Sequence, residues 1–199
     1  MPKTVDHDER REEILAAADA LVSRGGMPRL TMREIAREVG CSLGSLSHYF
    51  ADKSELVTAL LSRMHRTVGA RMQAAADDPG GLAAIRTVLL EAIPLDGRRH
   101  REAMVEISFW AQALGADSLM VVQQREHERF RRFLLQLLRQ ARRRGELRPS
   151  LNLSLIAEDL LVFIDGVTLQ GTLHPTRMTP AAQRRLVRNK VDGLAARNS

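Results

Sequence analysis

The chain has 199 residues, 44% of them hydrophobic and 27% charged, so it can bury a core and is not a disordered chain. Its formal net charge is +6, which favours a nucleic-acid or other acidic partner, although basic side chains also serve solubility. A single cysteine excludes an internal disulfide framework, and no apolar run approaches the roughly 20 residues that span a membrane. With no recognisable signal peptide, the cytoplasm is the expected location.

The N-terminal part begins with charged residues and continues as an apolar stripe. Residues 1–8 are predicted to be a mobile arm, and residues 9–23 an amphipathic helix that Gly25 and Gly26 end. Arg10 and Arg11 leave two interpretations open, because they can lie near DNA phosphates or be solvated surface charges. The helix is expected to support the two helices that follow.

Residues 31–50 predict two short helices joined by a tight turn. Thr31 is expected to cap the first helix, with Glu34 returning the bond three residues later as a capping box. Gly40 ends this helix, because glycine enters the left-handed conformation at little steric cost. Ser42 is expected to cap the second helix.

The second helix of this pair has one apolar and one polar side. Leu46 and Phe50 lie four residues apart and are expected to face inward, which leaves Ser45, Ser47, His48 and Tyr49 outward or at the edge. Two helices, a glycine turn and small polar groups on the second helix describe a helix-turn-helix that reads the DNA major groove. A pair of packed helices without DNA-binding function would carry the same caps.

Residues 31–56 also resemble the DNA-binding signature of TetR-family transcriptional regulators, closest to their BetI-like branch. The matching residues are Thr31, Ile35, Ala36, Gly40, Ser42, Gly44, Leu46, His48, Tyr49, Phe50, Lys53 and Leu56. Ser47 departs from the tyrosine that most members carry, and Leu43 replaces the usual lysine or arginine. The chain therefore lacks one side chain that the resemblance would place against the DNA backbone. Leu43 instead offers an apolar tip that can meet a thymine methyl group.

Pattern and resemblance together predict a set of DNA-binding residues. Thr31 and Tyr49 can donate hydrogen bonds to phosphates, and Lys53 can neutralise a phosphate at a helix N-terminus. The short serine side chains reach base edges only if the helix sits deep in the groove, which Gly44 permits. His48 either contacts DNA or packs beside the cap. The full set is Thr31, Arg33, Ser42, Leu43, Gly44, Ser45, Ser47, His48, Tyr49 and Lys53.

The remainder of the chain predicts further helices, which makes the expected fold an all-α, nine-helix TetR-like architecture. The expected helices cover residues 53–76, 82–93, 101–114, 118–144, 153–173 and 180–196, separated by glycine, proline and polar breaks. Residues 1–52 are interpreted as the DNA-binding domain and residues 53–199 as the effector-binding and dimerisation domain. Arginines 139 and 142–144 crowd the end of one helix, where cations suit the C-terminal carbonyl groups and are usually solvated.

The helix predicted over residues 153–173 is apolar nearly all round, which is typical of a helix buried from several sides. One chain of this size can hardly cover it, so a second subunit is expected. The Ile164-Asp165-Gly166 segment resembles the C-terminal part of TetR-family regulators, whose last two helices form a bundle between subunits. The dimerisation residues predicted on this basis are Ile164, Gly166, Val167, Leu186, Val187 and Val191.

The helices after residue 53 are also expected to enclose an effector pocket. Glu106 shares a helix side with Phe109 and Trp110, and Asp159 shares one with Phe163. Carboxylates beside aromatic rings suit a cationic amine such as choline or a polyamine. The competing interpretation is that these acids pair with arginines across the dimer.

Nothing in the sequence predicts catalysis. The six histidines show no metal-ligand spacing, so neither a metal nor a cofactor is expected. Cys41 is interpreted as a small packed residue rather than a redox sensor. The expected function is a ligand-responsive, homodimeric repressor that leaves a palindromic operator when a small molecule binds. The alternatives are a sequence-nonspecific nucleoid-type DNA-binding protein and a helical-bundle carrier or enzyme.

Overall fold

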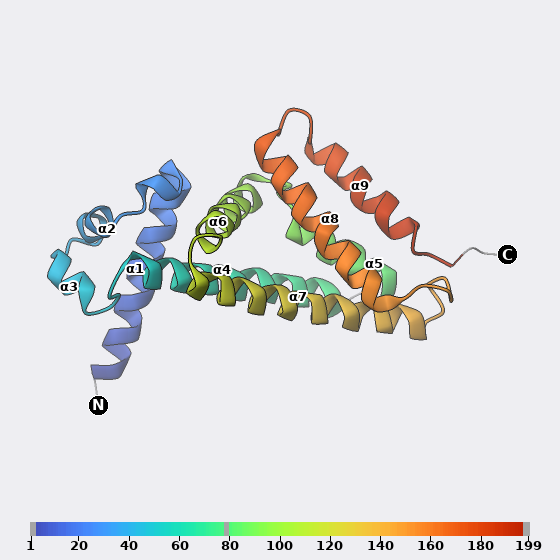
Figure 1. Ribbon diagram of the computed structural model, residues 1–199, viewed down its shortest axis with the longest axis horizontal. Helices are drawn as coiled ribbons and strands as arrows, with labels where there is room; N and C mark the ends of the chain where they lie inside the picture. Colours follow the sequence, from blue (N-terminus) through green and yellow to red (C-terminus); the bar gives the residue numbers. More distant parts are fainter. Residues whose placement is uncertain (1–2, 78–79, 197–199) are drawn as a thin grey trace. The chain divides into compact units, whose positions relative to one another are not determined.

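The computed structural model describes residues 3–77 and 80–196, and these residues form nine α-helices and one short 3₁₀-helix, η1 (Figure 1). The helices are α1 (Lys3–Gly25), η1 (Met27–Arg29), α2 (Met32–Val39), α3 (Leu43–Ser47), α4 (Lys53–Asp77), α5 (Gly81–Ala92), α6 (Gly97–Ala113), α7 (Asp117–Arg143), α8 (Leu153–Leu173) and α9 (Pro180–Asp192). The described residues hold no β-strand, only an isolated bridge between Leu147 and Ala195. The predicted all-α, nine-helix architecture is confirmed.

Three predicted boundaries were wrong. Helix α1 begins at Lys3, so residues 3–8 belong to a helix rather than to a mobile arm, while residues 1 and 2 lie outside the described residues. Helix α6 begins at Gly97, because the Asp96 carboxylate accepts a hydrogen bond from the Arg99 backbone N–H at 2.9 Å and starts the helix earlier. That backbone bond also lowers the pKa of Asp96. Helix α9 ends at Asp192 rather than near residue 196.

The first of two compact units contains the predicted helix-turn-helix. It comprises Met1–Met64 and Met104–Val122. Its core is a cluster of fully buried apolar side chains that includes Ile14, Leu30, Ile35, Leu46, Phe50, Leu56 and Phe109. The first turns of α4 share this core, so packing in this unit does not follow the functional boundary expected at residue 52. That boundary stays a prediction.

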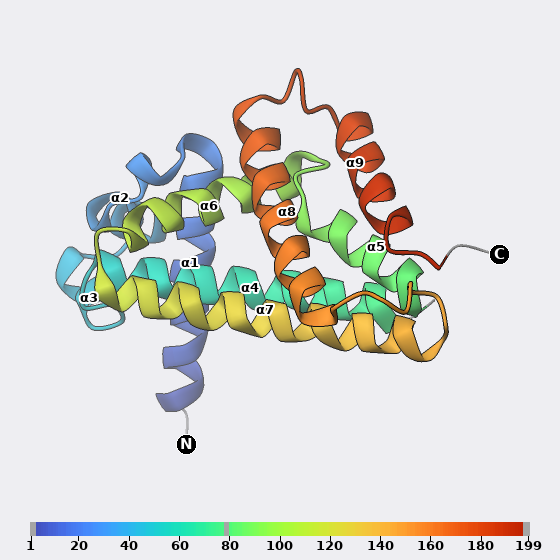
Figure 2. The same cartoon turned by 45° about the vertical axis from the view of Figure 1, so that its right-hand side comes forward.

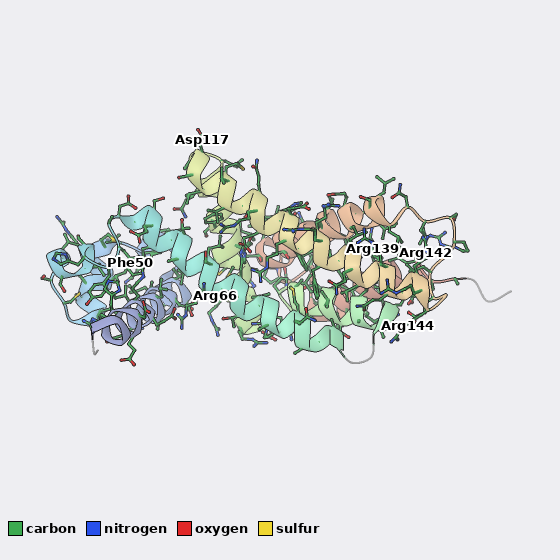
Figure 3. The ribbon with its side chains drawn as sticks, turned by 90° about the horizontal axis from the view of Figure 1, so that it is seen from below. Phe50, Arg66, Asp117, Arg139, Arg142 and Arg144 are labelled. Carbon is green, nitrogen blue, oxygen red and sulfur yellow. The ribbon has the colours of Figure 1, made fainter. Side chains whose placement is uncertain are left out.

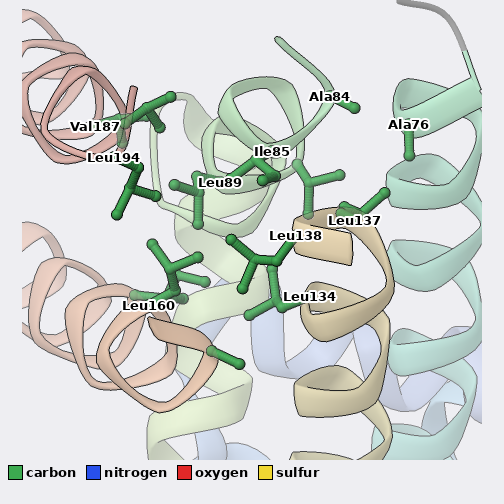
Figure 4. Close-up of a cluster of buried hydrophobic side chains, with 14 of the residues drawn as sticks. Ala76, Ala84, Ile85, Leu89, Leu134, Leu137, Leu138, Leu160, Val187 and Leu194 are labelled. Atoms are coloured by element: carbon green, nitrogen blue, oxygen red, sulfur yellow. The ribbon is translucent and has the colours of Figure 1, made fainter. Parts of the chain in front are cut away.

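The second compact unit comprises His65–Ala103 and Gln123–Ser199. Helices α5, α8 and α9 lie beside one another in it (Figure 2). Its core gathers apolar side chains from five helices, among them Ala76, Ile85, Leu89, Leu134, Leu138, Leu160 and Val187 (Figure 4). This unit therefore rests on one continuous apolar cluster, as expected for long amphipathic helices whose stability comes from packing.

A half-buried ionic network joins α4, α5 and α6 within the second unit. Two guanidinium nitrogens of Arg71 each donate to a different carboxylate oxygen of Glu102 at 2.7 Å, and a third donates to Glu91 at 3.3 Å. The bond to Glu102 raises the pKa of Arg71. Bidentate pairing of this kind fixes geometry as well as charge, so the network holds the three helices in register.

Candidate nucleic-acid interface

The helix-turn-helix is built by local hydrogen bonds that the sequence predicts. The Thr31 hydroxyl oxygen accepts from the Glu34 backbone N–H at 3.1 Å, and Gly40 ends α2 in the left-handed region at a φ of 70°. The reciprocal half of the predicted capping box is not formed, because the Glu34 carboxylate accepts from Arg37 at 2.5 Å while the Thr31 N–H donates to Arg29 O. One side chain therefore caps α2, not two.

Helix α3 has only five residues, and its environment keeps it in place. The Ser42 hydroxyl oxygen accepts from the Ser45 backbone N–H at 3.0 Å, which caps the helix as predicted. Leu46 and Phe50 are both 0% exposed and anchor the inner side in the core of the first unit. Isolated helices of this length are unstable in water, so these anchors and the flanking segments determine the orientation of α3.

The outer side of α3 is open and polar. The exposed residues here are Ser42, Leu43, Gly44, Ser45, Ser47 and His48. The Ser47 hydroxyl donates to Leu43 O at 3.0 Å, which leaves its oxygen able to accept a further hydrogen bond. The Ser42 and Thr31 oxygens accept from the backbone at their caps and keep their O–H groups for donation. Leu43 is 44% exposed, so an apolar tip does stand on this surface.

The remaining predicted DNA-binding residues flank this face within the first unit. Arg33 on α2 is exposed, and so is Lys53, the first residue of α4. Lys53 stands at the N-terminus of α4, where the Glu55 backbone N–H already donates to the Asp52 carboxylate at 2.8 Å. The lysine therefore adds its positive charge to the partial positive charge of the helix N-terminus. Tyr49 is half-buried, and its ring centroid lies 4.9 Å from that of His7.

Arg10 and Arg11 form contacts inside the unit rather than standing free. Arg10 pairs with Glu13 at 2.5 Å, which raises the pKa of its guanidinium, and donates to Val39 O at 3.4 Å. Arg11 donates to Tyr49 O and to the Glu55 carboxylate at 3.3 Å. Sequence reasoning missed these roles, because a charged residue on the polar side of a helix carries no signal of its distant partner.

The predicted effector residues are divided between the two units. Phe109 is 0% exposed and belongs to the core of the first unit. Trp110, also in the first unit, donates its indole N–H to Glu106 at 2.9 Å. Asp159 and Phe163 belong to the second unit, where they hold a cation of their own chain. The Lys190 ammonium lies 2.7 Å from Asp159 and 5.4 Å from the Phe163 ring centroid.

Two predictions about these residues change as a result. Phe109 has no exposed surface for a ligand, and the Asp159 carboxylate already pairs with a lysine of its own chain. Glu106 and Trp110 are half-buried neighbours, and their role in effector binding stays a prediction.

Four of the six predicted dimerisation residues need correction. Ile164, Val167, Val187 and Val191 are between 0% and 6% exposed within the core of the second unit, so they leave almost no surface for a partner. Gly166 and Leu186 are exposed, and their predicted role stands as a prediction. The error arose because the apolar pattern of α8 and α9 does not show which side packs within the chain.

The arginine cluster at the end of α7 is tied partly to its own loop (Figure 3). Arg142 donates to Leu151 O at 2.6 Å, and Arg144 lies 3.9 Å from Glu146.

Within the described ranges, no group of three or more His, Cys, Asp or Glu side chains could hold a metal ion. None of the helices described is both long and apolar enough to cross a membrane.

Comparison with known proteins agrees with this arrangement. Residues 14–60 match the tetR family of bacterial regulatory proteins, and residues 81–196 match the C-terminal domain of BetI-type transcriptional repressors. The HTH-type transcriptional regulator BetI of Serratia proteamaculans is 32% identical over 87% of this chain and 86% of that protein. The HTH-type transcriptional regulator PksA of Bacillus subtilis is 26% identical over 100% of this chain and 96% of that protein.

A solved structure shares the fold at low sequence identity. A transcriptional regulator of Saccharomonospora viridis, in complex with choline, has a TM-score of 0.86 and 19% identity over 96% of this chain and 100% of that one. With one family match over the helix-turn-helix and another over more than half of the chain, the protein belongs to the TetR family of transcriptional regulators and carries a BetI-type C-terminal domain.

Proposed function

We propose that this DNA-binding transcriptional regulator is a homodimeric repressor that places one α3 in each of two major-groove half-sites of a palindromic operator. The observation that carries the proposal is the division of α3 into a fully buried apolar side and an exposed serine side. An exposed helix face of short hydrogen-bonding groups can approach base edges closely, and Gly44 adds no side chain to hold it away.

An apolar stripe on α8 supports the proposal of a second subunit. Leu155, Val162 and Leu173 are 65%, 70% and 58% exposed, although the opposite side of the same helix is buried in the core. Gly166 lies between them in sequence, and a side chain added there would meet nothing within 4 Å. Another helix can therefore approach closely at Gly166 and bury leucine and valine side chains worth about 1.5–3 kcal/mol each.

In vitro selection of duplex DNA from a random library tests the proposal directly. The selected sequences should share two inverted half-sites whose centres lie about 34–36 Å, or a multiple, apart, because a two-fold dimer reads a two-fold site. A gel shift with the selected duplex and excess competitor DNA should show two chains per operator. A nucleoid-type protein would give no consensus, and its affinity would follow salt concentration alone.

We further propose that a cationic amine releases the repressor by favouring a conformation that does not fit both half-sites. Two observations support this class of effector. The Glu106 carboxylate lies against the Trp110 indole on α6, and the Saccharomonospora viridis regulator of the same fold was solved with choline. In a thermal-shift screen, choline or a polyamine should raise the melting temperature of the protein but not of a Glu106→Gln variant. Glu158→Gln, which alters an exposed carboxylate paired with Arg131, is the control. No stabilisation by any cationic amine would remove this class of effector.

A further inference from the structure

The segment that connects α3 to α4 is held from a third helix by the side chain of Arg11. Arg11 of α1 donates to the backbone carbonyl of Tyr49 and to the carboxylate of Glu55, which lies 3.3 Å from its second terminal nitrogen. Its guanidinium carbon also lies 4.1 Å from the centroid of the buried Phe50 ring. Figure 3 marks Phe50, the residue that follows Tyr49 between the two helices.

Glu55 links Arg11 to the rest of the segment that connects α3 to α4. One carboxylate oxygen of Glu55 accepts from Arg11, and the other accepts from the Ala51 backbone N–H at 2.8 Å. The Glu55 N–H in turn donates to Asp52 at 2.8 Å. Arg11 therefore fixes the segment between α3 and α4 at three points, which are the Tyr49 carbonyl, the Phe50 ring and the Glu55 carboxylate.

We infer that Arg11 is a positioning residue that sets the orientation of α3 for sequence-specific DNA recognition, and that it makes no phosphate contact. The inference rests on the proposed reading of bases by α3. A helix of five residues cannot hold its own orientation, and its C-terminal end is where a cation interacts best with the backbone carbonyls. Both terminal guanidinium nitrogens of Arg11 already donate, to the Tyr49 carbonyl and to the Glu55 carboxylate.

The guanidinium group is essential to this role. Its planar fork donates to a carbonyl and a carboxylate at once while its face lies on the Phe50 ring. A lysine ammonium is a point charge that cannot make these contacts together. Arg11→Lys should therefore keep the local charge and lose the orientation, which separates positioning from simple electrostatic attraction.

The experiment measures the affinity of Arg11→Ala and Arg11→Lys for two duplexes over a range of salt concentrations. One duplex is the consensus selected by the unaltered protein, and the other is an unrelated sequence of equal length. Both variants should bind the consensus about ten- to a hundredfold more weakly, as expected when charge-assisted hydrogen bonds that fix geometry are lost. Their affinity for the unrelated duplex and the slope of log affinity against log salt should stay unchanged.

Arg24→Gln is the matched control, because Arg24 also lies on α1 and pairs with an exposed carboxylate, Glu38, at 2.7 Å without touching α3 or the connecting segment. It should change neither affinity by more than about twofold. If Arg11→Ala does not fold, as judged by circular dichroism, Glu55→Gln replaces it. Glu55→Gln removes the charge facing Arg11, keeps an acceptor for Ala51, and should give a smaller loss with the same unchanged slope.

Two results would overturn the inference. Equal weakening on both duplexes with a salt slope reduced by about 0.9 per chain would make Arg11 a phosphate-binding residue. Unchanged affinity for the consensus would show that the interactions of Arg11 have no effect on recognition. If the unaltered protein selects no consensus at all, the proposed function itself fails, and this inference fails with it.

Discussion

Helices α3 and α8 carry the two halves of the proposed function, and they differ in how their inward sides are determined. Helix α3 has five residues, and its inward side follows from two fully buried side chains, Leu46 within the helix and Phe50 just after its end. Helix α8 has 21 residues and is apolar nearly all round. The comparison shows that the inward side of a short, mostly polar helix can be predicted from its few buried apolar anchors, whereas a long apolar helix leaves open which side its own chain covers.

The largest effect is expected from a charge on the uncovered side of α8. Val162→Arg would place an unpaired cation in the proposed subunit interface, at a cost of about 3–5 kcal/mol, or more than a hundredfold in dimer affinity. Analytical ultracentrifugation should show monomers, and operator binding should fall in parallel. Val121→Arg is the control, because Val121 is similarly exposed at 64% but lies on α7. A dimer that survives Val162→Arg would move the interface away from α8.

The two cores can be compared by the same truncation in each unit. Leu46→Ala and Leu138→Ala both alter leucines that are 0% exposed, and each should lower the free energy of unfolding by about 2–5 kcal/mol in urea titrations. At temperatures where both variants remain folded, only Leu46→Ala should weaken binding to the selected operator, because Leu46 anchors α3. Equal losses of DNA affinity would contradict a local role for the inner side of α3.

A smaller effect is expected at Lys53. Lys53→Ala should weaken binding to every DNA sequence and lower the salt slope by about 0.9 for each phosphate that the lysine no longer neutralises. Lys190→Ala removes a lysine that is already paired with Asp159, so its salt slope should match that of the unaltered protein. The phosphate role of Lys53 would be refuted by a loss confined to the operator sequence.

The smallest effects compare the caps of the two helices. Ser42→Ala and Asn152→Ala each remove a side chain that accepts backbone N–H bonds at an N-terminus, and each should cost about 1 kcal/mol of stability. Only Ser42→Ala should also reduce operator affinity in fluorescence anisotropy, since α3 is the helix proposed to contact the DNA. Reduced affinity of similar size in Asn152→Ala would show that local order at α8 also limits binding.

Much of the fold followed from local rules in the sequence. The sequence predicts Thr31, Gly40 and Ser42 as caps or stops, and each has that role in the structure. These interactions join residues a few positions apart, so their partners are visible in the sequence. The start of α6 was missed because Asp96, which caps it, stands in a polar segment that was interpreted as a loop.

The wrong and missed predictions concern residues whose contact partners are far away in the sequence. Lys190 pairs with Asp159, 31 residues earlier in the sequence, and lies over the ring of Phe163, and no spacing rule predicts that arrangement. Ile164 and Val187 were assigned to a partner subunit because apolar periodicity does not distinguish a side that packs within the chain from one that packs against another. Arg11 was missed for the same reason, since its partners lie near residue 50.

Repeating the DNA selection with a Ser45→Gln variant tests the central claim, that the outer side of α3 reads bases, most directly. Gln is longer than Ser and prefers adenine, so the account predicts a changed base at one position in each half-site, related by two-fold symmetry. Ser54→Gln, an exposed serine on α4, should leave the consensus unchanged. A Ser45→Gln variant that binds DNA and selects the same consensus as the unaltered protein would contradict the account.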